Sequence, residues 1–440
     1  MKKTLTVAVA LLFASNVAAQ AAQSGSQAMD QVLRALDAKR DVYADVAKQI
    51  WSFAELGYEE QRSSALLQSQ LRGAGFDVKT GVADVPTAFI ATYGSGRPII
   101  GIVGEFDALP GLSQKAVPQR EAITAGGSGH GCGHHLFGTA STAAAIAVKE
   151  WLETNHRIGT IRFYGTPAEE GGGGKVLMVD RGVFEGIDAA MMFHPSRNNL
   201  WTRGALAAQS LTIRFRGRAA HAAAMPEKGI NALNALLMTF HGINSLRQHV
   251  TSDVRIHGIV SHGGDAANIV PAFAEGEFLV RAGTRQALTD VLAKVKRCAE
   301  AGALATGASV ELEEGSVYAE RYNNPVLVEM FAENMRRLGI EGEQPPSQGG
   351  IGSSDIGNVS MVVPTIHPYL KIVDGDVSGH TPEFREASGS LQGFTAMLAA
   401  AKGLAMTVLD VMYRPGAVDE MWSAWRSSVK GAPDRHPPRI

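Results

Sequence analysis

One short segment of the sequence concentrates side chains that bind transition metals. Residues 129–135 read Gly-His-Gly-Cys-Gly-His-His, so three histidines and one cysteine occur in seven residues. Thiolate and imidazole groups suit zinc-like metals, and the glycines let the backbone bend tightly around an ion. The alternative, a glycine-rich loop with incidental histidines, does not account for this density. We therefore predict that Cys132 and His134 bind a metal.

A second segment supplies a pair of carboxylates. Glu169 and Glu170 lie within Gly165–Lys175, directly after a predicted strand, and ligands bind at the carboxyl ends of strands in open α/β sheets. Adjacent carboxylates usually point in different directions, so one can hold a metal while the other activates water. A solvated acidic turn is the alternative for this pair taken alone. The segment is not a phosphate-binding loop, because Val176 stands where that loop requires serine or threonine.

Three further histidines are dispersed along the chain. His194 precedes a proline after another predicted strand, His221 follows Arg-Ala-Ala, and His380 lies in the segment Gly-His-Thr-Pro. A single histidine of this kind is more often structural than a ligand. Together with the two segments above, however, these histidines predict a site on which distant parts of the chain converge.

The elements that must position these residues follow an α/β order. Helical periodicity covers residues 27 to 75, and short apolar strands then alternate with helices, which is typical of a largely parallel sheet. A helix is predicted from Leu136 to Leu152. The predicted strands are Ala88–Tyr93, Ile99–Gly104, Thr160–Tyr164 and Ala189–Phe193.

A different order of elements begins at Gly204 and indicates an inserted domain. Asn231 is a suitable N-cap for the first helix of this region. The order is β-α-β-β-α-β, that of a ferredoxin-like α+β domain. The predicted elements are Leu206–Phe215, Asn231–Gln248, Val254–Val260, Ala274–Arg281, Arg285–Thr306 and Ser309–Glu313.

These two patterns define the expected domain organisation. A catalytic domain in two segments, 23–203 and 318–440, surrounds the insert at 204–317. Helices at Pro325–Leu338 and Gly389–Tyr413 belong to the second segment. The tail after Arg414 carries several prolines, and we expect it to be peripheral.

Size and composition limit the class of protein. A chain of 440 residues is too long for one ordinary core, which indicates two or three domains. Apolar residues make up 45% and charged residues 19%, a globular composition. The net charge is −2 and no basic block occurs, so we predict no nucleic-acid partner.

The first residues carry the pattern of a secretory signal peptide. Lys2 and Lys3 form a charged start, Leu5–Ala14 is an apolar run, and small residues follow at Val17–Ala21. The run is shorter than the roughly 20 residues that span a bilayer. We predict that residues 1–22 are a signal peptide, that the mature chain is periplasmic or secreted, and that it has no membrane span.

The chain has two cysteines, Cys132 and Cys298. Exported proteins often join cysteines in a disulfide bridge, so these two could pair. The histidines around Cys132 favour a metal ligand instead.

Several motifs together resemble one enzyme family. They are similar to those of the dimetal aminoacylase and carboxypeptidase family, and within it to the branch of the p-aminobenzoyl-glutamate hydrolases and the auxin-conjugate amidohydrolases. The motifs follow the family order over nearly the whole mature chain. They are Glu55–Glu60, Gly104–Gly111, Gly131–His134, Gly165–Lys175, Phe193–Pro195, Ala219–Ala235, Asn268–Pro271 and His380–Phe384.

The resemblance implies a two-metal site. Two divalent ions per protomer, Zn²⁺, Mn²⁺ or Co²⁺, would be held by five ligands, one of which could bridge them. Glu169 would be the general base that takes a proton from the attacking water and later gives it to the leaving amine. The implied ligands are Cys132, His134, Glu170, His194 and His380.

The resemblance also gives roles to the inserted domain, which would act as a lid or dimerisation domain. His221 would stabilise the tetrahedral oxyanion, and in this family that histidine can come from the partner protomer of a homodimer. Asn268 and Arg281 would bind the substrate carboxylate. The sequence departs from the family at His135, where relatives usually have Asp or Asn, which bears on the tuning of the metal site.

The activity implied is hydrolysis of the amide bond of N-acyl or N-aroyl amino acids, such as aminobenzoyl-glutamate, by a metal-activated water. One alternative is a metallo-dipeptidase or carboxypeptidase that uses the same site on small peptides. A second alternative is a small-molecule-binding protein that has lost catalysis. The presence of Glu169, His221 and all five implied ligands argues against the second alternative.

Overall fold

The computed structural model describes residues 27–113, 115, 121–345 and 351–429. The predicted signal peptide lies outside the described residues. The chain divides into two compact units. The larger unit comprises the described parts of Met1–Arg203, Tyr322–Ser347 and Val362–Ile440, and the smaller unit those of Gly204–Arg321 and Gln348–Met361.

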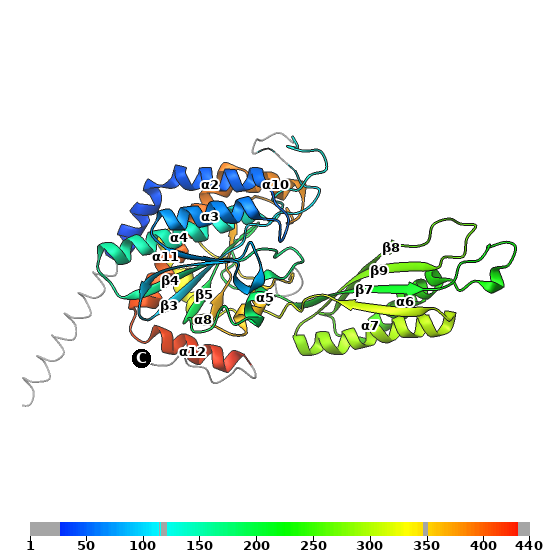
Figure 1. Cartoon of the computed structure of the whole chain (residues 1–440). Helices are drawn as coiled ribbons and strands as arrows, with labels where there is room; N and C mark the ends of the chain where they lie inside the picture. The colour runs from blue at the N-terminus through cyan, green and yellow to red at the C-terminus, as the bar shows by residue number, and fades with distance from the viewer. Residues whose placement is uncertain (1–26, 114, 116–120, 346–350, 430–440) are drawn as a thin grey trace, which may run out of the picture. The chain divides into compact units, whose positions relative to one another are not determined.

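The larger unit is built on a central sheet (Figure 1). The sheet has six strands in the order β1-β2-β4-β3-β5-β11. The last four strands of this order are parallel, and β1 and β2 add an antiparallel edge. The predicted α/β class with a largely parallel sheet is therefore confirmed. The strands are β1 (Asp77–Thr80), β2 (Phe89–Ser95), β3 (Ile99–Gly104), β4 (Gly159–Gly165), β5 (Ala189–Met191) and β11 (Thr365–Ile366).

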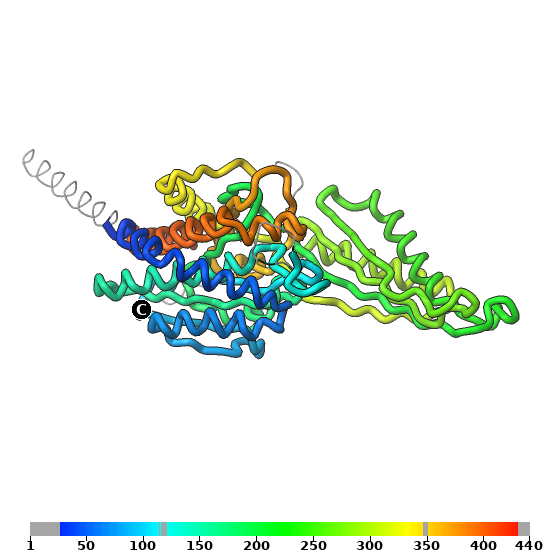
Figure 2. Tube along the Cα trace, turned by 90° about the horizontal axis from the view of Figure 1, so that it is seen from above, coloured from blue at the N-terminus to red at the C-terminus, as the bar shows by residue number. Residues whose placement is uncertain are grey.

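Helices cover this sheet. The predicted helical region 27–75 is interrupted, since residues 27–38 are followed by separate helices α2 and α3. In Figure 2 the helices α2, α4 and α11 run side by side, and α4 contacts both of the others. The helices are α2 (Arg40–Phe53), α3 (Gln61–Gly73), α4 (His134–Thr154), α5 (Gly174–Asp180), α8 (Pro325–Arg337), α10 (Pro382–Ser388), α11 (Leu391–Tyr413) and α12 (Ala417–Ser428).

The packing of α4 against α11 depends on small side chains. Both helices are rich in alanine, and Ala143, Ala144, Ala400 and Ala401 are almost fully buried. Small residues let two helix axes approach closely, so that many atoms come into van der Waals contact. Among the described helices, α11 alone is long and apolar enough to cross a membrane, but 72% of that apolar window is buried inside the unit. We therefore assign α11 to the core.

The smaller unit has the predicted β-α-β-β-α-β order. Its antiparallel sheet has the strand order β10-β7-β9-β8, and α6 and α7 pack on it. Asn231 and Thr284 cap the two helices with their side chains. The described residues 351–361, assigned above to the second catalytic segment, cluster with this unit. The elements are β7 (Ala207–Arg216), α6 (Ala232–Leu246), β8 (Arg255–His262), β9 (Phe273–Ala282), α7 (Arg285–Thr306), β10 (Ser309–Glu314) and α9 (Ile356–Ser360).

The described part of the tail after Arg414, residues 415–429, is not peripheral, so that prediction was wrong for this part. Residues 417–428 form α12, whose apolar face packs against α8 and α11. Met421, Trp422 and Trp425 are almost fully buried, and Asn324 donates a side-chain hydrogen bond to the Met421 carbonyl at 2.8 Å. The spacing of these apolar residues is that of a helix with one buried face, and the prolines that follow them lie outside the described residues.

We predict that Trp425→Ala lowers the free energy of unfolding of the larger unit by about 3–5 kcal/mol, because it leaves a cavity beneath α12. Chemical denaturation followed by circular dichroism would measure the change. Arg426→Ala, at the exposed neighbouring position, should change it by less than about 0.5 kcal/mol. An unchanged midpoint for Trp425→Ala would mean that α12 adds nothing to the core.

Candidate metal centre

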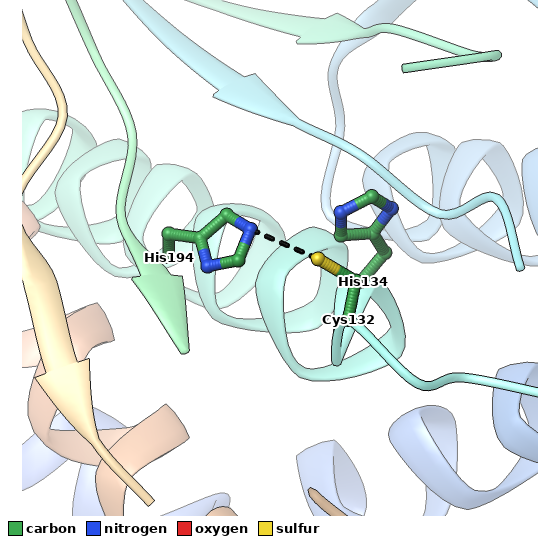
Figure 3. Close-up of side chains that lie close together, drawn as sticks. All are labelled: Cys132, His134 and His194. Atoms are coloured by element: carbon green, nitrogen blue, oxygen red, sulfur yellow. Dashed lines mark hydrogen bonds between the residues drawn. The ribbon is translucent and has the colours of Figure 1, made fainter. Parts of the chain in front are cut away.

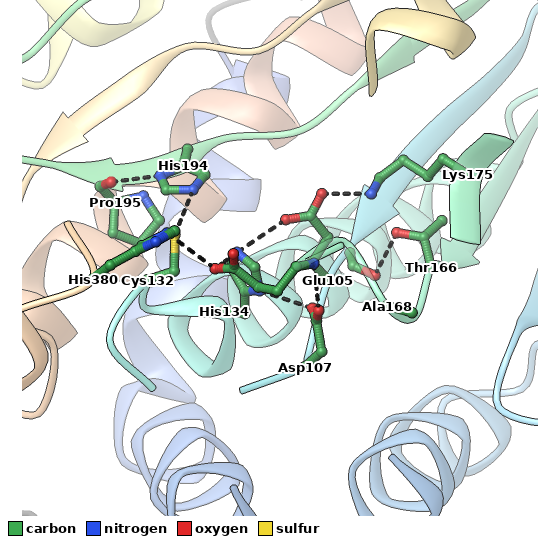
Figure 4. A network of polar contacts seen from close by, with 12 residues as sticks. Glu105, Asp107, Cys132, His134, Thr166, Ala168, Lys175, His194, Pro195 and His380 are labelled. Atoms are coloured by element: carbon green, nitrogen blue, oxygen red, sulfur yellow. Dashed lines mark hydrogen bonds and ion pairs between the residues drawn. The ribbon is translucent and has the colours of Figure 1, made fainter. Parts of the chain in front are cut away.

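Ligand-forming side chains of the larger unit gather into three overlapping groups. In each group one atom per residue lies within 4.8 Å of the others. Cys132 belongs to two groups and His134 to two (Figures 3 and 4). All five ligands expected from the sequence are among them. The groups are Cys132, His134 and His194; Cys132, Glu170 and His380; and Glu105, His134 and Glu169.

Strand ends and one helix start bring these residues together. Glu105 follows the end of β3, the Glu169–Glu170 pair follows β4, and His194 begins the short strand β6 (His194–Ser196) after β5. Strands β3, β4 and β5 are parallel, so their carboxyl ends meet at one edge of the sheet. His134 is the first residue of α4.

The loop before α4 requires glycine for close packing. Gly133 has a φ of 80°, in the left-handed region, and a Cβ there would lie 2.9 Å from the Pro195 side chain. The same loop holds the segment that carries His380, because the His380 amide donates to the Gly131 carbonyl at 3.0 Å. Chain segments far apart in sequence are thus joined at the site.

His134 is oriented by a carboxylate that the sequence analysis did not single out. Its Nδ1–H donates to Asp107 Oδ1 at 2.8 Å, which leaves Nε2 as the nitrogen that would bind a metal. Burial alone would lower the pKa of His134, but the charges of Asp107, Cys132 and Glu105 raise it well above its ordinary value. The interaction is mutual. Burial would raise the pKa of the Asp107 carboxyl, but the interaction with His134 lowers it.

Cys132 and His194 face each other. The Sγ of Cys132 lies 3.3 Å from Nε2 of His194 (Figure 3), and His194 Nδ1 donates to the Pro195 carbonyl at 2.6 Å. Burial and the charge of Glu170 would raise the pKa of the Cys132 thiol, but His194 and His134 lower it to about 6. The thiolate, which is the form that binds metals, is therefore favoured at neutral pH.

Glu170 and His380 form the opposite side of the centre. The Oε1 of Glu170 lies 3.3 Å from Nε2 of His380, and hydrogen bonding to Cys132 and Glu170 raises the pKa of His380. The Glu170 side chain is mostly buried, whereas His380 is about half exposed. His380 is thus the ligand of this set that borders solvent.

The donor set fits divalent metal ions. A thiolate, carboxylates and imidazoles converge in a largely buried space, and such an assembly of negative groups requires a cation. Nε2 of His134 is buried and makes no hydrogen bond within the described residues, although Glu105 Oε2 lies 3.3 Å away. Cys132 and His134 each belong to two groups. A thiolate sulfur has lone pairs for two ions whereas an imidazole nitrogen has one, so Cys132 is the residue that would contact both ions.

Glu105 and Lys175 form a buried ion pair (Figure 4), and Glu105 belongs to one ligand group with Glu169. Their charged atoms lie 2.6 Å apart, and both side chains are almost completely buried. The ion pair satisfies one oxygen of Glu105, and its other oxygen faces His134. Sequence reasoning gave no role to Glu105, Asp107 or Lys175. The sequence feature that could have pointed to Glu105 and Asp107 is the motif Gly104–Gly111, which begins where strand β3 ends.

His135, the departure from the family pattern, lies outside the ligand groups. Its ring is buried edge-on against Trp51 at 4.8 Å between centroids, and its Nε2–H donates to the Ser388 carbonyl at 3.1 Å. Burial lowers the pKa of His135 well below its ordinary value. The side chain therefore serves as a neutral link between the start of α4 and α10.

The other predicted site residues belong to the smaller unit. His221 forms an isolated β-bridge with Ile269, and the Ala222 amide donates to the Asn268 carbonyl at 3.0 Å, so His221 and Asn268 are neighbours. Arg281 lies near the other end of β9, about 26 Å along the strand from its start at about 3.3 Å per residue. Its Nε donates to Ser353 Oγ at 3.2 Å. One copy of this unit does not bring Arg281 near His221.

Comparisons with known proteins show the family of the chain. The model of the family described as "Peptidase family M20/M25/M40" matches residues 101–402. The chain is 45% identical to one component of the p-aminobenzoyl-glutamate hydrolase of Escherichia coli over 63% of this chain, but it spans only 58% of that protein. It is 35% identical to the mouse Xaa-Arg dipeptidase over 85% of this chain and 86% of that protein.

Solved structures share the fold. A dinuclear metal-binding peptidase of the M20 family from Bacillus subtilis has a TM-score of 0.59 at 22% identity, covering 86% of this chain and all of that one. An aminobenzoyl-glutamate utilization protein from Klebsiella pneumoniae has a TM-score of 0.65 at 19% identity, covering 87% of this chain and 98% of that one. At these identities the likeness shows the fold alone.

The fold and the centre define a metal-dependent hydrolase of amide or peptide bonds. The chain belongs to peptidase family M20/M25/M40.

We predict that Cys132→Ser sharply lowers the metal content of the purified protein. A serine hydroxyl does not replace a thiolate that belongs to two of the three ligand groups. Mass spectrometry for metals after dialysis would measure it. Cys298→Ser changes the other cysteine, a half-buried residue of α7, and should leave the metal content intact. Equal metal content in the two variants would contradict the assignment of Cys132.

Proposed function

We propose that this chain is a two-metal amidohydrolase that cleaves N-acyl or N-aroyl amino acids. The observation that carries the proposal is the pair of ligand groups that share Cys132, with Glu169 in a group beside them. The similarity to p-aminobenzoyl-glutamate hydrolase supports an aroyl amino acid as substrate. A ligand set of one thiolate, imidazoles and a carboxylate supports Zn²⁺, Mn²⁺ or Co²⁺ as the metal.

The residues of the larger unit have complementary tasks in this proposal. Bound divalent ions would polarise the scissile carbonyl and lower the pKa of water. Asp107 holds His134 in the tautomer whose Nε2 faces the centre, and Pro195 does the same for His194. Glu169 takes the proton of the attacking water and delivers it to the amine that leaves. Lys175 compensates the charge of Glu105, so Glu169 is not surrounded by carboxylates alone.

A dipeptidase is the second candidate. The chain aligns with the Xaa-Arg dipeptidase over 86% of that protein, a longer match than with the aminobenzoyl-glutamate hydrolase. Both activities break an amide bond next to a free carboxylate, so the same centre serves either. What separates them is the group on the acyl side of that bond.

We predict that Glu169→Gln lowers kcat by about 10²–10⁴-fold on the best substrate of a panel of N-aroyl amino acids, N-acyl amino acids and dipeptides, because the amide cannot accept the proton. Metal content should be unchanged. Wild-type activity should disappear with a chelator and return with zinc, manganese or cobalt. Glu329→Gln, an exposed residue of α8, is the matched control. Full activity of Glu169→Gln would remove Glu169 as the base.

We further propose that two copies of the chain pair through β8. This strand is an edge of the smaller unit's sheet, and its Ile259 and Val260 are 61% and 43% exposed. An exposed apolar edge is a template for another strand. The distance between Arg281 and His221 within one unit also supports a site to which two copies contribute. Residues 1–22 support export of the chain to the periplasm or beyond.

We predict that wild-type protein has the mass of a dimer in light scattering and that Ile259→Lys combined with Val260→Lys gives a monomer, because two charges oppose strand pairing. Leu304→Lys, at a position of α7 that is 87% exposed, should leave the mass of the dimer unchanged. A monomeric wild-type protein would exclude the proposed pairing.

A further inference from the structure

The residue before the two glutamates has an unusual backbone conformation. Ala168 has a φ of 56°, in the left-handed region that residues other than glycine rarely adopt, and it is fully buried. The Gly173 amide donates to its carbonyl at 2.8 Å and closes a tight turn around the pair. A conformation of this kind persists only where the surroundings hold it. The group that holds Ala168 therefore influences where Glu169 and Glu170 point.

Glu60 is that group. Its Oε1 accepts a hydrogen bond from the Ala168 amide at 2.8 Å, 108 positions along the chain, and its Oε2 accepts one from the Thr87 hydroxyl at 3.0 Å. The side chain of Glu60 is fully buried, and Thr87 is nearly so. Burial, together with the charge of Asp107, raises the pKa of Glu60 to about 7. Both the neutral and the charged form keep an oxygen that accepts from Ala168.

Other contacts hold the turn on its remaining sides. The Glu170 amide donates to Asp107 Oδ2 at 2.9 Å, and the Tyr58 hydroxyl donates to the Gly172 carbonyl at 2.7 Å. At Gly57 a Cβ would approach Ala168 to 3.0 Å, so this segment lies directly against the turn. Asp107 also orients the metal ligand His134. The side-chain hydrogen bonds that the structure describes for Glu60 join it to Thr87 and Ala168, and neither of these is a proposed metal ligand.

We propose that Glu60 is a positioning residue for hydrolysis. Through the Ala168 amide it fixes the turn from which the Glu169 carboxylate takes up its place as the base while Glu170 faces the metal centre. Glu60 touches no reacting atom in this scheme. The inference rests on the proposed role of Glu169.

Two substitutions of Glu60 separate the effect of its side-chain length from the effect of its charge. Glu60→Asp keeps the carboxylate but shortens the side chain by one carbon–carbon bond, roughly 1.5 Å, so it cannot reach Ala168. Glu60→Gln keeps the length and an acceptor oxygen for Ala168, and its amide can face Thr87. We expect Glu60→Asp to lower kcat by about 10–100-fold with KM within about threefold and with metal content unchanged. Glu60→Gln should restore kcat to within about threefold of wild type.

Two further variants complete the experiment. Thr87→Val removes the hydrogen bond to the other oxygen of Glu60 and should lower kcat by about 3–10-fold, which gives a test even if Glu60→Asp does not fold. Ser64→Ala removes a buried 2.7 Å hydrogen bond to the Thr87 carbonyl and is the control for loss of buried polarity. It should keep wild-type kcat. Melting temperatures verify that each variant is folded.

Three results would overturn the inference. The first is wild-type kcat in Glu60→Asp, or in Thr87→Val if Glu60→Asp does not fold. The second is an active Glu60→Asp beside an inactive Glu60→Gln, and the third is a loss of activity that follows loss of metal. An inactive Glu169→Gln with a fully active Glu60→Asp would reject the positioning role alone. An active Glu169→Gln would reject the base itself.

Discussion

The constraint on which this structure depends is the concentration of negative charge in a buried space. Cys132, Glu105, Asp107 and Glu170 surround His134, and an uncompensated charge is costly in such a place. The protein compensates part of it internally, since Lys175 pairs with Glu105 and Nδ1–H of His134 with Asp107. Cys132 and Glu170 face imidazoles whose Nε2 atoms can bind metals. Their remaining charge is what bound cations would neutralise, so the metal centre completes the fold as well as the reaction.

The scaffold follows from that constraint. Carboxylates and histidines from distant parts of the sequence meet only because β3, β4 and β5 are parallel and end at one edge. The helix that starts with His134 is held by its alanine-rich contact with α11. His380 reaches the centre after the chain has left the larger unit, formed the smaller unit and returned. The hydrogen bond from its amide to Gly131 then joins the two halves of the ligand set.

Much of this could be predicted from the sequence, where the signal is local. The strand Ile99–Gly104 and the helix Arg285–Thr306 have the predicted bounds, because period and capping residues lie within each segment. The dense clusters around Cys132 and Glu169 identified the centre for the same reason. The contacts of Asp107, Lys175 and Glu60 could not be found in this way, since the hydrogen bond from Ala168 to Glu60 spans 108 positions. The burial of α12 was missed because its partners, α8 and α11, are tertiary neighbours.

The adjacency of Glu169 and Glu170 explains why backbone contacts matter so much here. Two neighbouring residues share one peptide unit. A backbone rotation that turns one carboxylate toward its target therefore turns the other carboxylate away from its own. Packing around the side chains cannot resolve this conflict, because both carboxylates must stay accessible to ligands. Hydrogen bonds to the backbone on either side can, and the structure has one at the Ala168 amide and one at the Glu170 amide. Each of these amides donates to a buried carboxylate on a separate segment, Glu60 for Ala168 and Asp107 for Glu170. The turn is thereby fixed by residues that lie outside the reacting groups.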